Sequence, residues 1–160
     1  MAKLFFSMSE LIHSDTAIKY KINNMPDITS MDNMLDLIHY LLNPLRTYLK
    51  RPVNVSSGFR CKELNTKVGG SKNSQHLKGQ AVDILVDGMK PKDLAKFILN
   101  TNLEFDQLIL ERRGFVEWVH ISYVHNNNRN QYLEIIEWNI HFCLNKENSL
   151  KQNTTINLTL

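Results

Sequence analysis

The chain has 160 residues, of which 42% are hydrophobic and 22% are charged. This length predicts one domain, or one domain followed by a tail. Such a chain has enough apolar residues to bury a core without disulfides or structural metal ions. The net charge of +3 is mild, so it is compatible with an anionic partner such as cell wall or nucleic acid but does not require one.

Cysteines and apolar runs exclude several classes of protein. Cys61 and Cys143 form no CxxC pair, so we expect two ordinary thiols and no disulfide framework. No apolar run approaches the roughly 18 residues of a membrane helix, and Leu4-Phe5-Phe6 is too short for the core of a signal peptide. We therefore expect no membrane partner, and synthesis in the cytoplasm without a signal peptide.

Helices are predicted first in chain order. Ser7 and Glu10 fit a capping box at the start of a short helix, and residues 13–30 are predicted to be loop with at most one turn. The main helix is predicted over residues 31–50, capped by Ser30 or Asp32. Its apolar face consists of Leu35, Ile38, Leu42, Leu45 and Leu49. Pro44 predicts a kink or break near Leu42.

Strands follow, with one inserted helix. Residues 52–57 and 81–86 are predicted strands, separated by a loop or short helix, and Pro91 begins a helix that ends near Asn100. Residues 105–110 and 116–124 are predicted to form a hairpin around the turn at 112–114. Residues 132–138 fit a strand or a helix, and we favour the strand.

This order of elements predicts an α+β fold, with a small, mostly antiparallel sheet and helices packed on one side. We expect a single domain over residues 1–138. Residues 139–160 are polar and rich in asparagine, and they are predicted to form a poorly packed tail.

Three residues suggest a metal site. Asp83 is a carboxylate in the middle of an apolar strand, and His120 lies between Val119 and Ile121 in another, so both need polar partners if buried. If the two strands are neighbours, Asp83 and His120 can converge, and His76 can close the site from a loop. Two imidazoles and one carboxylate suit Zn²⁺ and leave a fourth position for water.

The residues alone leave an alternative open. Asp83 could instead pair with an arginine, while both histidines only form hydrogen bonds. His39, on the polar face of the main helix, is not expected to be a ligand.

Five segments in order resemble a known family. They are Ser56-Ser57-Gly58-Phe59-Arg60, Gly69-Gly70-Ser71, Ser74-Gln75-His76 through Gly79, Ala81-Val82-Asp83, and Trp118-Val119-His120-Ile121-Ser122. Together they resemble the zinc D-alanyl-D-alanine carboxypeptidase family, which includes VanX- and VanY-type D,D-peptidases and phage L-alanyl-D-glutamate endopeptidases. The resemblance spans most of residues 5–135 and implies a Hedgehog/D,D-peptidase-like fold. The opening, residues 9–17, resembles the small, phage-associated branch.

The resemblance implies specific roles. His76, Asp83 and His120 would be the ligands of one Zn²⁺ ion, Glu117 the general base, and Arg60 the group that stabilises an oxyanion or binds a substrate carboxylate. Ser74 and Gln75 would orient His76, although ordinary loop residues need no such role, and Trp118 would support the site or the substrate.

Glu117 presents one difficulty. Positions 117 and 120 of a regular strand point to opposite faces, so Glu117 reaches the metal only if the strand begins near Trp118 or bulges there. Otherwise Glu117 faces solvent and His125 is the next candidate base. Arg112 and Arg113 are more typical of a solvated turn than of a substrate clamp.

The expected function is zinc-dependent hydrolysis of peptidoglycan stem peptides by a monomeric wall hydrolase. The expected absence of a signal peptide favours a phage or prophage enzyme, which a holin or the virion delivers to the wall, over a bacterial D,D-carboxypeptidase. The alternative is a non-catalytic, zinc-containing wall-binding module of the same fold. A nucleic-acid partner is not expected, because no basic stripe interleaved with aromatic residues is present. The residues do not determine whether a D-Ala-D-Ala, L-Ala-D-Glu or cross-bridge bond is cut.

Overall fold

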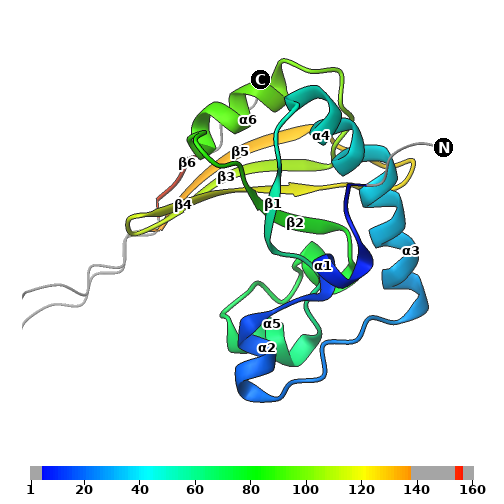
Figure 1. The fold of residues 1–160 in the computed structure, drawn as a ribbon. Coiled ribbons are helices and arrows are strands. Elements are labelled where there is room, and N and C mark those ends of the chain that lie inside the picture. The colour runs from blue at the N-terminus through cyan, green and yellow to red at the C-terminus, as the bar shows by residue number, and fades with distance from the viewer. Residues whose placement is uncertain (1–4, 138–153, 157–160) are drawn as a thin grey trace, which may run out of the picture.

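The computed structural model describes residues 5–137 and 154–156 (Figure 1). Its elements are α1 (Met8–Ile12), α2 (Asp15–Tyr20), α3 (Ile28–Asp36), the π-helical η1 (Leu37–Leu42), α4 (Asn43–Leu49), β1 (Asn54–Ser57), α5 (Lys62–Lys67), the 3-10 helix η2 (Gln75–Lys78), β2 (Ala81–Leu85), α6 (Pro91–Leu99), β3 (Gln107–Arg113), β4 (Val116–Ser122), β5 (Gln131–Glu137) and β6 (Thr154–Ile156).

The strands form one sheet in the order β1-β2-β4-β3-β5-β6. All neighbouring strands are antiparallel except β3 and β5, which are parallel. The predicted α+β class and mostly antiparallel sheet are therefore confirmed. After β4 the chain crosses to the other side of β3 and forms β5 there. Strand β5 runs opposite to β4 and therefore parallel to β3.

The hairpin of β3 and β4 is longer than its sequence suggested. Arg113 pairs with Val116, so Arg112 and Arg113 belong to β3 rather than to a turn. The loop consists of Gly114 and Phe115, and Gly114 has a φ of +60°, a conformation that glycine adopts without steric cost.

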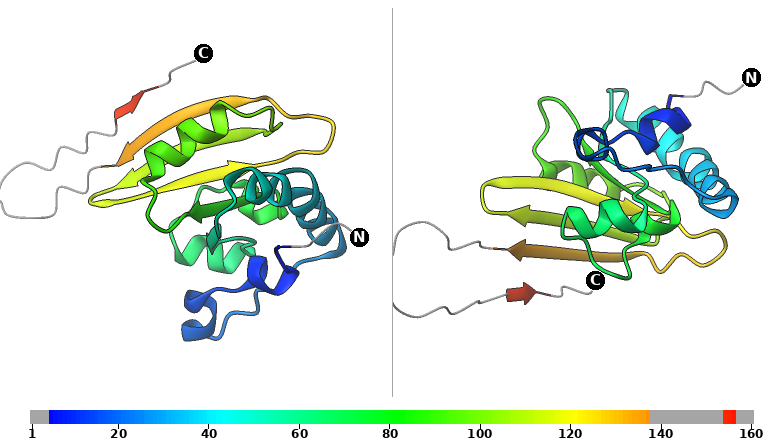
Figure 2. Two further views of the ribbon diagram at one scale, coloured as in Figure 1. Left: turned by 45° about the horizontal axis from the view of Figure 1, so that its top comes forward. Right: turned by 90° about the horizontal axis from the view of Figure 1, so that it is seen from below.

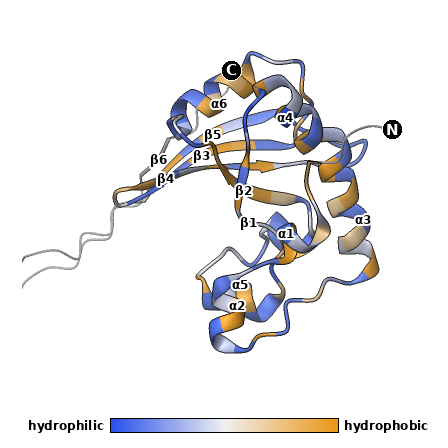
Figure 3. Cartoon of the chain, viewed as in Figure 1, coloured by the Kyte–Doolittle hydropathy of each residue, from blue (hydrophilic) through white to orange (hydrophobic). Residues whose placement is uncertain are grey.

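The long helices cover one face of the sheet, as predicted (Figure 2). The continuous helical segment α3–η1–α4 and helix α6 pack their apolar faces on alternate residues of the central strands. In the ribbon of Figure 3, hydrophobic residues recur along α3, α6 and the central strands. The core includes Leu37, Leu41, Leu45, Leu94 and Ile98 from the helices, and Val82, Ile84, Leu108, Leu110, Val119 and Ile121 from the strands. The intervening strand residues, among them Asp83 and His120, face the opposite side.

The main helix begins earlier than predicted. Asp27 caps it, because its Oδ1 accepts a hydrogen bond of 2.7 Å from the N–H of Ser30. Instead of breaking near Leu42, the chain passes through the π-helical η1 into α4, at whose start Pro44 lacks an N–H. The irregularity predicted near Leu42 is therefore present, but it is a π-helical segment, which is wider than an α-helix, and not a break.

The segment predicted as loop over residues 13–30 contains α2. Ser14 caps this helix by accepting a hydrogen bond from the N–H of Ala17. Ala17 is the buried residue of α2, so the sequence there shows no apolar period from which a helix could be predicted.

The predicted tail, residues 139–160, lies outside the described residues except for β6, which pairs with β5. The predicted domain boundary at residue 138 therefore stays a prediction. Among the helices of the described residues, none is long and apolar enough to cross a membrane.

Candidate metal centre

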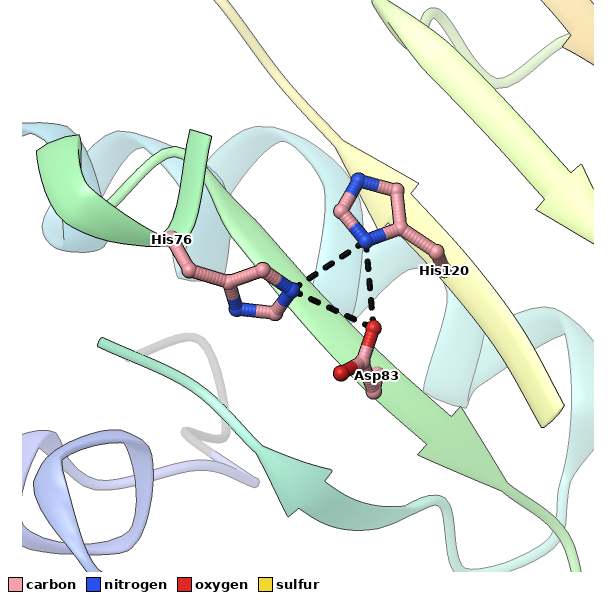
Figure 4. Close-up of side chains that lie close together, drawn as sticks. All are labelled: His76, Asp83 and His120. Carbon is pink, nitrogen blue, oxygen red and sulfur yellow. Dashed lines mark hydrogen bonds and ion pairs between the residues drawn. The ribbon is translucent and has the colours of Figure 1, made fainter. Parts of the chain in front are cut away.

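Three elements bring His76, Asp83 and His120 together (Figure 4). Asp83 on β2 lies directly opposite His120 on β4 in the antiparallel register, and η2 carries His76 to the same place. The three residues are buried, with exposed fractions of 2% for His76, 8% for Asp83 and 7% for His120.

The donor atoms form a nearly equilateral triangle. Asp83 Oδ1 lies 3.2 Å from His76 Nε2 and 3.1 Å from His120 Nδ1. The two nitrogen atoms are 3.2 Å apart. Tetrahedral ligands at the usual zinc distances are separated by about 3.3 Å, so the triangle fits the spacing of ligands around one zinc ion.

The protonation of His76 also favours a cation. Its Nδ1 lies 2.7 Å from the main-chain oxygen of Gly58, so Nδ1 carries a proton and donates it. In the neutral ring Nε2 then presents a lone pair to Asp83 and His120. Burial lowers the pKa of His76 below its ordinary value, against the attraction of Asp83. A metal ion satisfies these converging lone pairs without requiring a buried imidazolium.

Arg60 holds the other oxygen of Asp83. Its Nη2 donates to Oδ2 at 2.8 Å, and its Nε donates to Ser57 Oγ at 2.9 Å. Burial would raise the pKa of Asp83, but the two histidines hold it well below its ordinary value. An arginine partner for Asp83 therefore coexists with the histidine cluster: Arg60 occupies Oδ2, and Oδ1 faces the histidines.

Neighbouring residues fix the short helix that carries His76. Ser74 caps η2, since its Oγ accepts a hydrogen bond from the N–H of His76. Gln75 donates from Nε2 to Asp106 Oδ2 at 2.8 Å, which ties η2 to the residue just before β3. Gly79 ends η2 with a φ of +69°, and a Cβ there would lie 2.4 Å from the main-chain oxygen of Ser30.

The cluster borders a cleft of about 660 Å³. Its walls are the loop between α1 and α2, strand β1, the segment between α5 and η2, and every second residue of β3 and β4. Arg60, Ser74, Gln75 and Trp118 all line this cleft. Within the described residues, Trp118 Nε1 is buried without a hydrogen-bond partner.

In the comparison with protein families, the chain matches the model described as Peptidase M15 over residues 5–122. The chain belongs to the Peptidase M15 family. The matched segment includes the whole His76–Asp83–His120 cluster and ends with β4. The family resemblance drawn from the sequence is thus confirmed at this level. No curated protein gives a significant match to the chain.

In this M15 chain the cluster does not include Glu117. Strand β4 begins at Val116 and is regular through the site, so Glu117 lies on the face opposite His120. There it accepts hydrogen bonds from Arg112 Nε at 3.2 Å and Nη2 at 2.8 Å. His125 lies elsewhere too, with its Nδ1 3.3 Å from Asp36. Neither residue lines the cleft.

A carboxylate that the sequence analysis missed does line the cleft of the M15 domain. Glu111 lies on β3, with its Oε1 3.9 Å from His120 Nδ1 and its side chain 26% exposed. Burial raises the pKa of Glu111 above its ordinary value. The signal was the alternation of Gln107, Ile109 and Glu111, but ending the predicted strand at Leu110 left Glu111 outside it.

Proposed function

We propose that this chain is a zinc metallopeptidase that hydrolyses peptidoglycan stem peptides, as a D,D-carboxypeptidase or an endopeptidase. The observation that carries the proposal is the buried His76–Asp83–His120 triangle, with donor atoms 3.1–3.2 Å apart, at a cleft in a chain of a peptidase family. Three such ligands with an open side are typical of catalytic rather than structural zinc sites.

The chain's own groups suit peptide hydrolysis. When bound, Zn²⁺ supplies a Lewis acid for the scissile carbonyl and lowers the pKa of water to about 7. Arg60 keeps Asp83 in place and also borders the cleft. Its hydrogen bonds to Ser57 and Asp83 use two of the five N–H donors of a guanidinium. Its remaining donors would stabilise a substrate oxyanion or carboxylate.

The substrate class follows from the sequence resemblance to D,D-peptidases and L-alanyl-D-glutamate endopeptidases, and the polar groups that line the cleft suit a peptide. We further propose that the protein acts as a monomer at the cell wall, as a phage or prophage wall hydrolase delivered by a holin or by the virion. This last proposal rests on the likeness of residues 9–17 to the phage-associated branch.

One observation favours a second candidate, a non-catalytic wall-binding module that keeps the metal. Glu117, the expected base, is turned away from the cluster and bound to Arg112. Such a module would bind zinc and stem peptide but release no product.

The deciding experiment is mass spectrometry of muropeptides, the soluble fragments of peptidoglycan, after incubation with the zinc-loaded protein. We expect loss of D-alanine or cleavage after L-alanine, which a chelator abolishes. Absence of any product, with one equivalent of zinc bound, would favour the binding module. The mass of the product also identifies the bond that is cut.

A further inference from the structure

Two glutamates lie close to the metal cluster in sequence or in space, but on opposite faces of the same hairpin. The register pairs Arg112 with Glu117 and Glu111 with Trp118. Because side chains alternate along a strand, Glu117 shares the face of the helix-covered core, and Glu111 shares the face of His120. Of the two carboxylates, the hairpin therefore presents Glu111 to the cleft.

The surroundings of the two carboxylates differ accordingly. Glu117 Oε1 accepts two hydrogen bonds from Arg112, an arrangement that fixes the carboxylate in an ion pair. Glu111 Oε1 lies 3.9 Å from His120 Nδ1, the atom that faces Asp83 and His76. Glu111 is thus adjacent to the donor triangle and in contact with the cleft.

The distance of 3.9 Å separates Glu111 from the ligand set itself. The three donor atoms are 3.1–3.2 Å apart, close to the spacing of about 3.3 Å within one tetrahedral zinc site. Glu111 is also not among the residues whose donor atoms all lie within 4.8 Å of one another. Its carboxylate therefore lies beside the ligand set, where it would contact a water molecule rather than serve as a fourth ligand. A general base needs this position, within hydrogen-bond reach of the water.

We infer that Glu111, not Glu117, is the carboxylate that activates the attacking water, an inference that rests on the proposed peptidase function. The water oxygen forms a bond to the scissile carbonyl carbon while its proton passes to Glu111. The same proton then moves to the leaving nitrogen as the C–N bond breaks. The products are a carboxylic acid and an amine, and Glu111 returns to its ionised form. Glu117 and Arg112 stabilise the hairpin.

The test compares Glu111→Gln with the matched variant Glu117→Gln. Each substitution keeps the size of the side chain and removes its charge. Three quantities are measured for both variants and the wild type: muropeptide turnover, the melting temperature, and zinc affinity by competition with a chelator. Glu111→Asp is included because it keeps the carboxylate but draws it back by one methylene.

For Glu111→Gln we expect a loss of turnover of about 10²- to 10⁴-fold, with zinc affinity within a few-fold of the wild type. Glu111→Asp should retain more turnover than Glu111→Gln. Glu117→Gln should keep turnover within a few-fold of the wild type.

Three outcomes would overturn the inference. The first is near-normal turnover by Glu111→Gln. The second is loss of turnover by a folded, zinc-loaded Glu117→Gln. The third is a large loss of zinc affinity in Glu111→Gln, which would make Glu111 a ligand. If the zinc-loaded wild type itself cleaves no muropeptide, the proposed function fails and the inference falls with it.

Discussion

His76 donates a hydrogen bond from Nδ1 to the main-chain oxygen of Gly58 at 2.7 Å. This contact sets the tautomer of His76 and turns Nε2 toward Asp83 and His120. Gly58 in turn lies so close to α1 that a Cβ on it would be 2.1 Å from the main-chain oxygen of Leu11. The first helix, the end of β1 and the metal cluster are therefore coupled through one residue without a side chain.

Gly58→Ala is expected to weaken both the fold and the metal site. The added methyl group must displace Leu11 or the chain at Gly58, and overpacking of this kind costs about 1–3 kcal/mol. Any shift of the Gly58 oxygen also loosens His76, so zinc affinity should fall about tenfold or more. Chemical unfolding and chelator competition measure the two effects.

Gly88→Ala is the matched control, since a Cβ at Gly88 meets no atom within 4 Å, although its φ is +72°. It should cost about 1–2 kcal/mol from its left-handed backbone and leave zinc affinity unchanged. Equal losses of zinc affinity in both variants would contradict the proposed coupling.

Zinc is expected to stabilise the fold through the cluster. At a free zinc concentration about 1000 times Kd, binding adds about 4 kcal/mol, which for a domain of this size raises Tm by about 10 °C. His76→Ala and His120→Ala should abolish this increase. His39→Ala, at an exposed histidine on η1, should retain it. Scanning calorimetry with and without chelator measures the shift, and a full shift in His120→Ala would exclude His120 as a ligand.

The arrangement of the site could be predicted where it depends on local alternation. Asp83 and His120 lie in apolar strands, and a buried polar residue in such a strand requires a polar or metal partner. If the two strands are adjacent and in the observed register, they bring these two residues together. The α+β class could also be predicted from local patterns. The spacing of apolar residues distinguishes helical from strand-like segments, and the order of these segments along the chain indicates the class.

Features that depend on where a strand ends or pairs could not be predicted. Ending the predicted strand at Leu110 rather than Arg113 left Glu111 outside it, so its alternation with Gln107 and Ile109 was not followed to the cleft face. Glu117 was assigned by family resemblance, but a regular β4 turns it to the other face. The parallel pairing of β3 with β5 is a long-range contact that no local pattern encodes.

Arg60→Lys is expected to impair the site while keeping its charge. Lysine cannot reproduce the two bonds that the planar guanidinium makes to Ser57 and Asp83. Loss of such a partner of a metal ligand typically costs about 10- to 100-fold in metal affinity or activity. Ser57→Ala removes only the Nε bond and should have a smaller effect. Chelator competition and muropeptide turnover check both variants, and unchanged values for Arg60→Lys would contradict this role.

Asp106 links the site to the rest of the sheet. It is 1% exposed, accepts from Gln75 at 2.8 Å, and accepts from Arg129 Nε at 2.7 Å. Burial would raise its pKa, but the hydrogen bonds from Arg129 and Gln75 hold the pKa of Asp106 below its ordinary value. As the pH falls, the Asp106 carboxylate is therefore protonated in the unfolded chain at a higher pH than in the folded protein. The stabilisation is complete above about pH 4 and is lost as the pH falls through the lower folded pKa.

Asp106→Asn should lower the free energy of unfolding by about 1–3 kcal/mol at pH 7, because the hydrogen-bond donors of Arg129 and Gln75 lose a charged acceptor. As the pH falls through the lowered folded pKa of Asp106, the variant and the wild type should converge, since the wild-type carboxyl then becomes protonated as well. Urea unfolding from pH 7 to pH 2 measures the difference. Glu104→Gln, at a nearby exposed carboxylate, is the control and should show little change. Wild-type and Asp106→Asn curves that stay parallel down to pH 2 would show that the charge of Asp106 does not stabilise the fold.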